Sequence, residues 1–193
     1  FLSVSDLSAE SLTLSWGGAT DNVGVVSYRI YQDNMEIGEV ESATDLPVTG
    51  LHPGTNYLFR VEAQDAAENL SFGGPALAIQ TTDESAPTWT EGAELVVSNI
   101  KPQSLYVGWD PATDEVGVEA YQVLQDKVEI ASLDGQTTWL KVEGLSPWTN
   151  YAFEVYAWDA AGNGIAQPLS ADTMTPDLQA PTWSPNTVLL PSN

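Results

Sequence analysis

The sequence predicts an all-β protein built from two tandem copies of one small domain. Short segments alternate apolar and polar residues, which is the period-two pattern of strands that bury one face. Clusters of Gly, Pro, Asn and Asp interrupt these segments at intervals of about 8–12 residues, the spacing of antiparallel sandwiches. The chain also repeats itself, and no stretch of its 193 residues has the spacing of an amphipathic helix.

An internal repeat organises the whole chain. Trp16 recurs 93 residues later as Trp109, and segment 20–25 recurs at the same distance as 113–118. After a one-residue insertion the distance becomes 94 residues. Two further segments repeat at this second distance, 50–57 as 144–151 and 65–69 as 159–163. Each residue of one copy can therefore be compared with its counterpart in the other.

The repeat also predicts where the domains begin and end. Ala-Pro-Thr-Trp at 86–89 returns at 180–183, so a further copy begins there. The chain starts without Met and inside the first strand of its first copy, so we expect it to be the interior of a longer protein. We divide it into three parts: residues 1–83 as the first repeat, 84–176 as the second, and 177–193 as a linker and the first-strand stub of a third.

Three pairs of matching segments carry the strand prediction. In 12–16 the alternation places Leu12, Leu14 and Trp16 on one face. In 105–109 it does the same with Leu105, Val107 and Trp109. The other two pairs are 57–63 with 151–157 and 46–48 with 140–142.

Charge is the most unusual feature of the composition. Asp and Glu number 27 against five Lys and Arg, which gives a formal net charge of −22. Such a surface repels phosphate backbones and anionic lipid headgroups, so neither nucleic-acid binding nor membrane insertion is expected. The chain has no Cys, which excludes disulfides and thiolate chemistry. No apolar run reaches the length of about 18 residues that a membrane-spanning helix needs.

Several ordered motifs resemble the fibronectin type III domain. They are a Trp closing the second strand, a Tyr opening the third, and Gly-Leu-x-Pro-x-Thr-x-Tyr, and each is present twice. The resemblance implies an immunoglobulin-like β-sandwich of seven strands in each copy. In it Trp16 and Trp109 are core anchors, and Tyr57 and Tyr151 are tyrosine corners whose hydroxyls return to the backbone of the preceding turn. Segments 20–25 and 159–163 are similar to the bacterial branch of the family. Domains of that branch commonly lie in secreted glycoside hydrolases and surface adhesins.

Residues suited to catalysis are few. The single His, His52, lies in a turn where the second copy has Ser146, and a lone loop His is expected to be solvated. Ser-His-Asp catalysis needs a Ser activated by an imidazole, and no Gly-x-Ser-x-Gly motif, phosphate-binding Gly loop or zinc-ligand spacing occurs. We expect no enzymatic activity.

Carboxylates and amides gather in the loops. In the topology that the resemblance implies, the loop after the second strand and the loop before the last strand share one pole. Hard oxygen ligands suit Ca²⁺, which extracellular modules bind at about 10⁻⁴–10⁻³ M. One interpretation is a Ca²⁺ ion that stiffens the array, and the other is that these side chains brace their own turns by hydrogen bonds to the backbone. The linker enters the second copy at the same pole, so we expect Asp83 and Glu84 to approach Asp114 and Asp159. The residues of this candidate site are Asp21, Asp65 and Asn69 in the first copy, Asp114, Asp159 and Asn163 in the second, and Asp83 and Glu84 in the linker.

The second copy carries aromatic residues that the first copy lacks. Alternation sends Leu140 and Val142 inward, so Trp139 should point outward, and exposed aromatic residues mark contact surfaces. These could stack on sugar rings, pack against a neighbouring subunit, or be covered by the adjoining domain, and we favour protein packing. Trp89 and Trp183 are expected to wedge each domain against its predecessor. The predicted contact surface consists of Leu124, Trp139, Trp148, Tyr156 and Trp158.

Two functions are consistent with these features. The first is a non-catalytic spacer repeat of a secreted or cell-surface protein, forming a semi-rigid acidic stalk or filament. The second is an accessory carbohydrate-binding module of a polysaccharide-degrading enzyme. The expected partners are neighbouring repeats of the same chain, with other copies in a fibre or a polysaccharide as alternatives, and the expected location is outside the cell.

Overall fold

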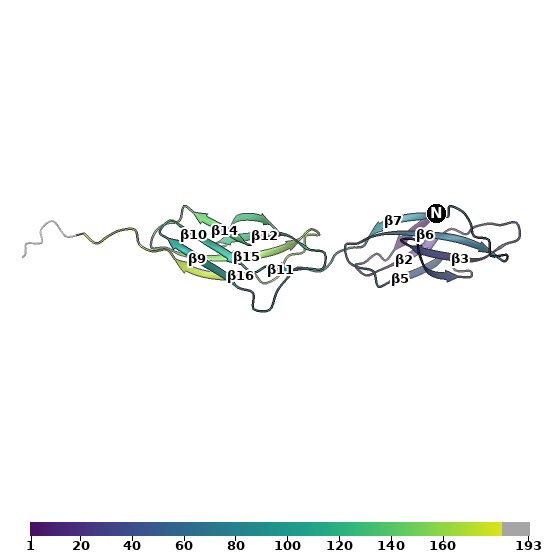
Figure 1. The fold of residues 1–193 in the computed structure, drawn as a ribbon, viewed down its shortest axis with the longest axis horizontal. Helices are drawn as coiled ribbons and strands as arrows, with labels where there is room; N and C mark the ends of the chain where they lie inside the picture. The colour runs from purple at the N-terminus through teal and green to yellow at the C-terminus, as the bar shows by residue number, and fades with distance from the viewer. Residues whose placement is uncertain (183–193) are drawn as a thin grey trace, which may run out of the picture. The chain divides into compact units, whose positions relative to one another are not determined.

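The computed structural model describes residues 1–182 (Figure 1). They form two compact units, one from Phe1 to Ser85 and a second that begins at Ala86. All regular secondary structure in the described range is β, so the all-β prediction is confirmed, and the range contains no helix that could cross a membrane. Residues 177–182 form no strand. Trp183 and the rest of the predicted third-copy stub, including Val188–Leu190, lie outside the described residues.

The first unit is a sandwich of two antiparallel sheets. One sheet has the strand order β1-β2-β5 and the other β4-β3-β6-β7. The strands are β1 (Leu2–Ser5), β2 (Ser11–Trp16), β3 (Val25–Gln32), β4 (Met35–Val40), β5 (Asp45–Thr49), β6 (Asn56–Asp65) and β7 (Ala76–Gln80).

The core of this unit lies between the two sheets. The alternation in β2 buries Leu12, Leu14 and Trp16, while Thr13 and Ser15 between them are only partly buried. Trp16 is 3% exposed and meets Tyr28 of the facing sheet edge-to-face, with ring centroids 5.8 Å apart. Truncating a core Trp to Ala removes about 3–5 kcal/mol of stability, so Trp16 is a main determinant of this fold. The remaining buried apolar residues are Ile30, Val48, Leu51, Tyr57, Phe59 and Val61.

The second unit repeats this plan and adds two short strands. Its sheets have the orders β14-β10-β9 and β13-β12-β15-β16, and β8 and β11 form a separate two-stranded pair. The added pair was not predicted from the sequence. The strands are β8 (Thr88–Trp89), β9 (Leu95–Lys101), β10 (Ser104–Trp109), β11 (Ala112–Thr113), β12 (Val118–Gln125), β13 (Val128–Asp134), β14 (Trp139–Glu143), β15 (Asn150–Asp159) and β16 (Leu169–Met174).

The second core has the same organisation as the first. Trp109 is 6% exposed and packs edge-to-face on Tyr121, with centroids 5.5 Å apart. Val107, Phe153 and Val155 are fully buried between the sheets. The two cores therefore use equivalent positions of the repeat, such as Trp16 with Trp109 and Phe59 with Phe153.

Tyrosine hydroxyls hold the loops of both units. The Tyr57 hydroxyl accepts a hydrogen bond from the His52 backbone N–H at 2.8 Å, and the Tyr151 hydroxyl accepts one from the Ser146 N–H at the same distance. These are the contacts that the family resemblance implies. Two further hydroxyls, those of Tyr28 and Tyr121, have an equivalent role at the opposite end of the sheet. They accept hydrogen bonds from the backbone of Ala19 at 2.9 Å and of Ala112 at 2.8 Å.

Two turns keep the same left-handed geometry although their residues differ. Glu68 has φ 64° where the second unit has Gly162 at φ 90°, and Trp148 has φ 53° where the first unit has Gly54 at φ 56°. A left-handed backbone is costly for residues with a Cβ atom, by about 1–2 kcal/mol. Glu68 and Trp148 therefore store strain that glycine would relieve.

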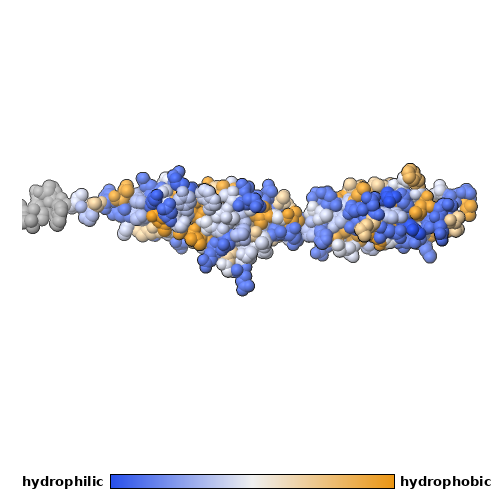
Figure 2. All heavy atoms as spheres, viewed as in Figure 1, coloured by the Kyte–Doolittle hydropathy of each residue, from blue (hydrophilic) through white to orange (hydrophobic). Residues whose placement is uncertain are grey.

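Acidic groups dominate the surface, and most of the basic side chains are paired with them. Figure 2 shows hydrophilic residues spread over both units, with apolar residues among them. Four basic side chains form ion pairs: Arg29 with Glu36, Arg60 with Glu62, Lys127 with Glu154, and Lys141 with Glu143.

Candidate functional site

The acidic turns of the first unit lie at one pole, as predicted. Asp21, Asp65 and Asn69 line one shallow hollow of about 150 Å³. Asp21 Oδ2 accepts hydrogen bonds from the N–H groups of Val23 at 2.8 Å and Gly24 at 3.1 Å. Asp65 Oδ1 accepts from the Asn69 N–H, and its Oδ2 accepts from the Asn69 side-chain amide at 2.8 Å. Both carboxylates thus brace the turns in which they lie.

These hydrogen bonds also determine the protonation of the two carboxyls. Donation by the Val23 and Gly24 amides lowers the pKa of Asp21 below its ordinary value, although the nearby Asp65 charge opposes the shift. Donation by the Asn69 side chain, and then by its backbone N–H, lowers the pKa of Asp65. Both groups are therefore more strongly ionised in the folded unit than in an unfolded chain.

The second unit builds the same arrangement from Asp114, Asp159 and Asn163. Asp114 Oδ1 accepts hydrogen bonds from Val116 and Gly117 at 2.9 Å, and Asp159 accepts two from Asn163 at 2.7 Å. One carboxylate oxygen of Asp114 lies within 4.8 Å of one of Asp159. The pair is close enough to share a cation, and Asp159 is only 4% exposed.

The two acidic linker residues end the first unit. Asp83 Oδ1 accepts a hydrogen bond from the Ser85 N–H at 3.2 Å, and Glu84 Oε1 accepts one from the Thr82 hydroxyl at 3.1 Å. Their predicted approach to Asp114 and Asp159 stays a prediction.

The predicted contact surface of the second unit is divided between two faces. Trp139 belongs to the β14-β10-β9 sheet, whereas Leu124, Tyr156 and Trp158 belong to the β13-β12-β15-β16 sheet. Both sheets turn their inner faces to one shared core, so their outward side chains point in opposite directions. The five predicted residues therefore do not make one continuous surface.

Trp139 forms the more open of the two aromatic groups. Its side chain is 59% exposed, and its ring lies 6.0 Å from that of Tyr106 on the neighbouring strand, at an interplanar angle of 36°. The counterpart of Trp139 in the first unit is Asp45, which is exposed in β5. This aromatic pair is specific to the second unit.

Trp158 is less accessible than Trp139. It is 37% exposed, and it packs closely against Gly164, where a Cβ atom would approach the indole ring to 2.6 Å. Leu124 and Tyr156 on the same face are only partly buried. This face therefore combines partly buried side chains with the Trp158 ring, which packs against the loop that contains Gly164.

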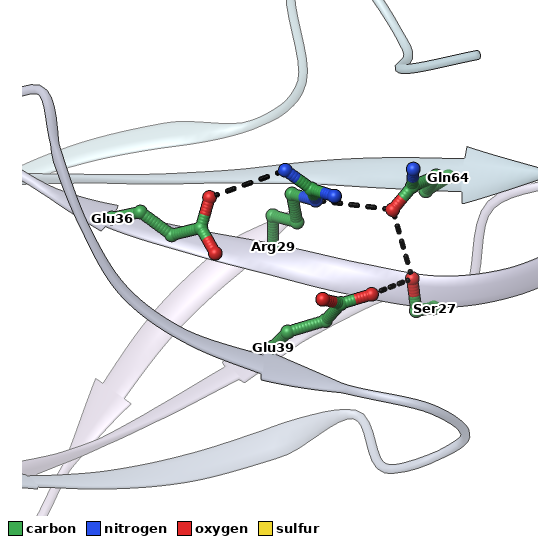
Figure 3. Close-up of polar contacts among 5 residues, drawn as sticks. All are labelled: Ser27, Arg29, Glu36, Glu39 and Gln64. Atoms are coloured by element: carbon green, nitrogen blue, oxygen red, sulfur yellow. Dashed lines mark hydrogen bonds and ion pairs between the residues drawn. The ribbon is translucent and has the colours of Figure 1, made fainter. Parts of the chain in front are cut away.

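The same face of the first unit carries a polar network. Gln64 replaces Trp158, and its Oε1 accepts hydrogen bonds from Arg29 at 3.0 Å and Ser27 at 3.4 Å (Figure 3). Ser27 also donates to Glu39 at 2.6 Å, and Arg29 pairs with Glu36 at 3.4 Å (Figure 3). An aromatic face is therefore not a general property of this domain.

Glu62, which stands where the second unit has Tyr156, is buried although it points outward by alternation. It is 3% exposed and binds Arg60 at 2.5 Å, the Ser71 hydroxyl at 2.6 Å and the Gly74 N–H at 3.2 Å. The alternation in the sequence predicts its direction correctly. It does not predict the loop that covers the side chain.

Trp148 and His52 are the remaining residues that the sequence singled out. Trp148 is 69% exposed in the turn before β15, apart from both aromatic groups on the strands. His52 is exposed in the equivalent turn of the first unit, and its backbone N–H donates to Tyr57. Neither turn places a Ser or Cys nucleophile against a base among the described contacts.

Trp89 has a role that sequence reasoning missed. The wedge against the preceding domain stays a prediction, and the structure shows that the indole of Trp89 packs within the second unit. Its ring stacks on Tyr121 with centroids 6.1 Å apart and an angle of 14°, and its Nε1–H donates to the Gln167 carbonyl at 2.9 Å. Strand β8, which carries Trp89, pairs with β11 through Ala112. No periodic pattern surrounds Trp89, so alternation could not have revealed this packing.

Comparison with known proteins shows what this architecture is similar to. The chain is 34% identical over 192 residues to chitinase A1 of Niallia circulans, and the match spans 94% of this chain and 26% of that protein. It is 32% identical over 184 residues to exoglucanase B of Cellulomonas fimi, and this match spans 88% of this chain and 16% of that protein. Among solved structures, a two-domain fibronectin type III segment from chicken tenascin spans 91% of this chain and 98% of its own at 21% identity, with a TM-score of 0.40.

The relatives also include proteins with other named activities. An α-amylase of Niallia circulans is 30% identical over 182 residues, and the chain spans 13% of its length. The chain thus covers about a quarter or less of each of these relatives. The model of the fibronectin type III domain matches residues 1–76 and again residues 85–172. Two sandwiches of this topology, matched along most of their length, show that the chain belongs to the fibronectin type III family.

Proposed function

We propose that the chain is a pair of non-catalytic spacer modules, an acidic stalk within a longer extracellular protein that acts on polysaccharides. Both units build a packed apolar core between their two sheets. The paired carboxylates of the acidic turns, Asp21 with Asp65 and Asp114 with Asp159, accept hydrogen bonds from their own loops.

One observation carries this proposal. The same tandem module matches a chitinase, an exoglucanase and an α-amylase, while covering only 26%, 16% and 13% of their lengths. These three proteins have different named activities, yet all contain a segment similar to this chain. The shared segment therefore does not determine which activity each protein has. A spacer or an accessory module satisfies that condition, because its role does not depend on which bond is cleaved.

Hydrolysis assays test the absence of catalysis directly. The 193-residue chain is incubated with chitin, cellulose and starch, and released reducing sugar is compared with a buffer blank. We expect no release above the blank. Sugar release that scales with protein concentration and disappears on thermal unfolding would contradict the proposal.

The spacer role needs a test in the full-length protein. Replacing residues 1–176 by a flexible Gly/Ser linker of equal residue number should leave activity on a soluble oligosaccharide unchanged. Activity on the insoluble polymer should fall, because a flexible linker samples many end-to-end distances and does not hold its two ends at a fixed separation. Equal activity of both proteins on the polymer would contradict the spacer role.

Polysaccharide binding is a second candidate, favoured by the Trp139–Tyr106 pair. Two neighbouring rings on an outer face, of which Trp139 is 59% exposed, offer apolar area to a sugar ring. The first unit lacks the pair because Asp45 replaces Trp139. If sugars bind here, binding belongs to the second unit alone.

Pull-down on chitin, cellulose and starch separates the two candidates. Retention that Trp139→Ala abolishes, and that Asp45→Ala and Trp158→Ala preserve, would establish binding at this face. Equal retention of Trp139→Ala and the parent chain would exclude it. No retention of the parent chain leaves the spacer role as the function of both units.

We also propose Ca²⁺ binding at the acidic turns as a source of stiffness. The close carboxylates of Asp114 and Asp159 supply the hard oxygens that Ca²⁺ prefers, and each can still accept an ion on its free lone pairs. The hydrogen bonds of these turns already support the alternative, in which the side chains only brace the loops. Thermal melts with about 5 mM CaCl₂ and with excess chelator, at equal ionic strength, distinguish them. Identical midpoints would exclude calcium.

A further inference from the structure

The first unit has an apolar groove beside its central tryptophan. The groove has a volume of about 170 Å³ and opens to solvent. Beside it lies Phe72, whose side chain is fully exposed at 104%. A fully exposed aromatic ring next to an apolar groove marks a candidate contact surface. The residues that line the groove include Trp16, Ala19, Tyr28, Val61, Phe72 and Gly73.

The second unit has the same place, and there it is filled. Ala112 and Tyr121 are the counterparts of Ala19 and Tyr28, 93 residues later, and Gln167 is the counterpart of Gly73, 94 residues later. Trp89 touches all three: its strand pairs with Ala112, its ring stacks on Tyr121, and its N–H donates to the Gln167 carbonyl. The indole of Trp89 thus occupies the position that is a groove in the first unit.

The two places share their framework. The Ala19 N–H donates to the Tyr28 hydroxyl at 2.9 Å, as the Ala112 N–H does to the Tyr121 hydroxyl at 2.8 Å. The loop on the other side is also in register, since Ser71 N donates to Ala63 O and Ile165 N donates to Ala157 O. The groove of the first unit therefore has the walls of an indole site.

Exposure shows that this site is uncovered. Tyr121 is 0% exposed beneath Trp89, whereas Tyr28 is 8% exposed. Ala112 is buried at 8%, whereas Ala19 is exposed and belongs to no strand. The differences lie at the residues that an indole and its strand would cover.

We propose that this groove is the receptor for a tryptophan side chain on a segment immediately ahead of Phe1, of the Ala-Pro-Thr-Trp type that the chain carries at 86–89 and 180–183. Trp89 lies five residues before Glu94, the counterpart of Phe1, so the docking Trp lies five residues before Phe1. Its ring stacks on Tyr28, its N–H donates to the Gly73 carbonyl, and its strand pairs with Ala19. Phe72, which replaces Ala166, adds an apolar contact on the outer side.

The graft of a known segment tests the proposal. Residues 86–93 are placed directly before Phe1 in the full 193-residue chain, and a matched graft carries Trp89→Ala in the added segment. Both proteins and the parent are compared by ¹H–¹⁵N NMR and by urea unfolding read from the amide signals of each unit. The added indole should gain a protected N–H signal, and the amides of Ala19, Tyr28 and Gly73 should shift.

The Trp graft should also lower the unfolding equilibrium constant of the first unit by about tenfold or more, because it adds a stacked ring and a hydrogen bond. The Ala graft should leave it near the parent value, and the second unit should be unchanged by either. Equal effects of the two grafts, or no effect of the Trp graft, would overturn the proposal. A further outcome would also overturn it: the groove signals of the parent chain weaken as its concentration rises, and Trp183→Ala prevents this weakening. The occupant of the groove would then be Trp183 of a second copy.

Discussion

Trp89→Ala distinguishes a tryptophan that belongs to a domain core from one that serves only a junction. The substitution removes a half-buried ring, its stacking on Tyr121 and one hydrogen bond to the Gln167 carbonyl. It leaves the backbone of β8 free to pair with β11. All of the lost contacts lie in the second unit, so the loss of stability should be confined there.

The magnitude follows from the lost area and the lost hydrogen bond. A Trp side chain buries about 150–250 Å² when it packs, so a half-buried ring removes about 100 Å² from water. At about 25 cal/mol per Å² this contributes about 2.5 kcal/mol. The hydrogen bond adds about 1 kcal/mol, and residual structure in the unfolded chain reduces the sum to about 3 kcal/mol. Trp89→Phe keeps most of the area and should lose about 1 kcal/mol.

Urea unfolding followed by NMR measures the free energy of unfolding of each unit separately in one sample. Trp148→Ala is the matched control, because Trp148 is 69% exposed and its loss should change stability by less than about 0.5 kcal/mol. A fall of less than about 1 kcal/mol for Trp89→Ala, or equal falls in both units, would refute the assignment of Trp89 to the core of its own domain.

Three further perturbations test other features of the fold. Tyr151→Phe removes the acceptor for the Ser146 N–H at 2.8 Å and should destabilise the second unit by about 1–3 kcal/mol. The control Tyr106→Phe should have little effect. Similar urea midpoints for both variants would contradict the role of Tyr151 as a tyrosine corner. Glu68→Gly should stabilise the first unit by about 1 kcal/mol by relieving a φ of 64°, and a lower midpoint would show that the turn is not strained. Because the folded pKa values of Asp21 and Asp65 are lowered, their contribution is complete above the ordinary value of 3.8 and is lost as the pH falls through the lower folded values. Melting of the first unit between about pH 5 and pH 2 should show this loss, and Asp65→Asn should reduce its size; identical pH profiles would contradict it.

The strands and cores could be predicted because each depends on local alternation. In any β-strand, alternate side chains point to the same side, so Leu12, Leu14 and Trp16 share one side of β2. The recurrence of this pattern in the second copy indicated that it is not accidental. The tyrosine contacts followed from the family resemblance. Both kinds of inference need only the direction of a side chain and its place in a known topology.

The aromatic surface could not be predicted in the same way, because it depends on which strands share a sheet. Trp139 and Tyr156 lie on strands that are consecutive in the sequence, β14 and β15, yet the chain crosses between sheets at that point. Two outward residues on consecutive strands consequently face opposite sides. Glu62 illustrates a second limit, since alternation cannot show that a loop folds over an outward side chain.

The scarcity of positive charge has a consequence for the behaviour of the protein in solution. Four of its five basic side chains are held by acidic neighbours, so most of the carboxylates have no cation to offset them. Mutual repulsion among these anions opposes compaction, and dissolved salt weakens that repulsion over a Debye length of about 10 Å at 0.1 M. High salt should therefore stabilise the folded state of this polyanion. At low ionic strength, concentrated molecules of the protein should repel one another.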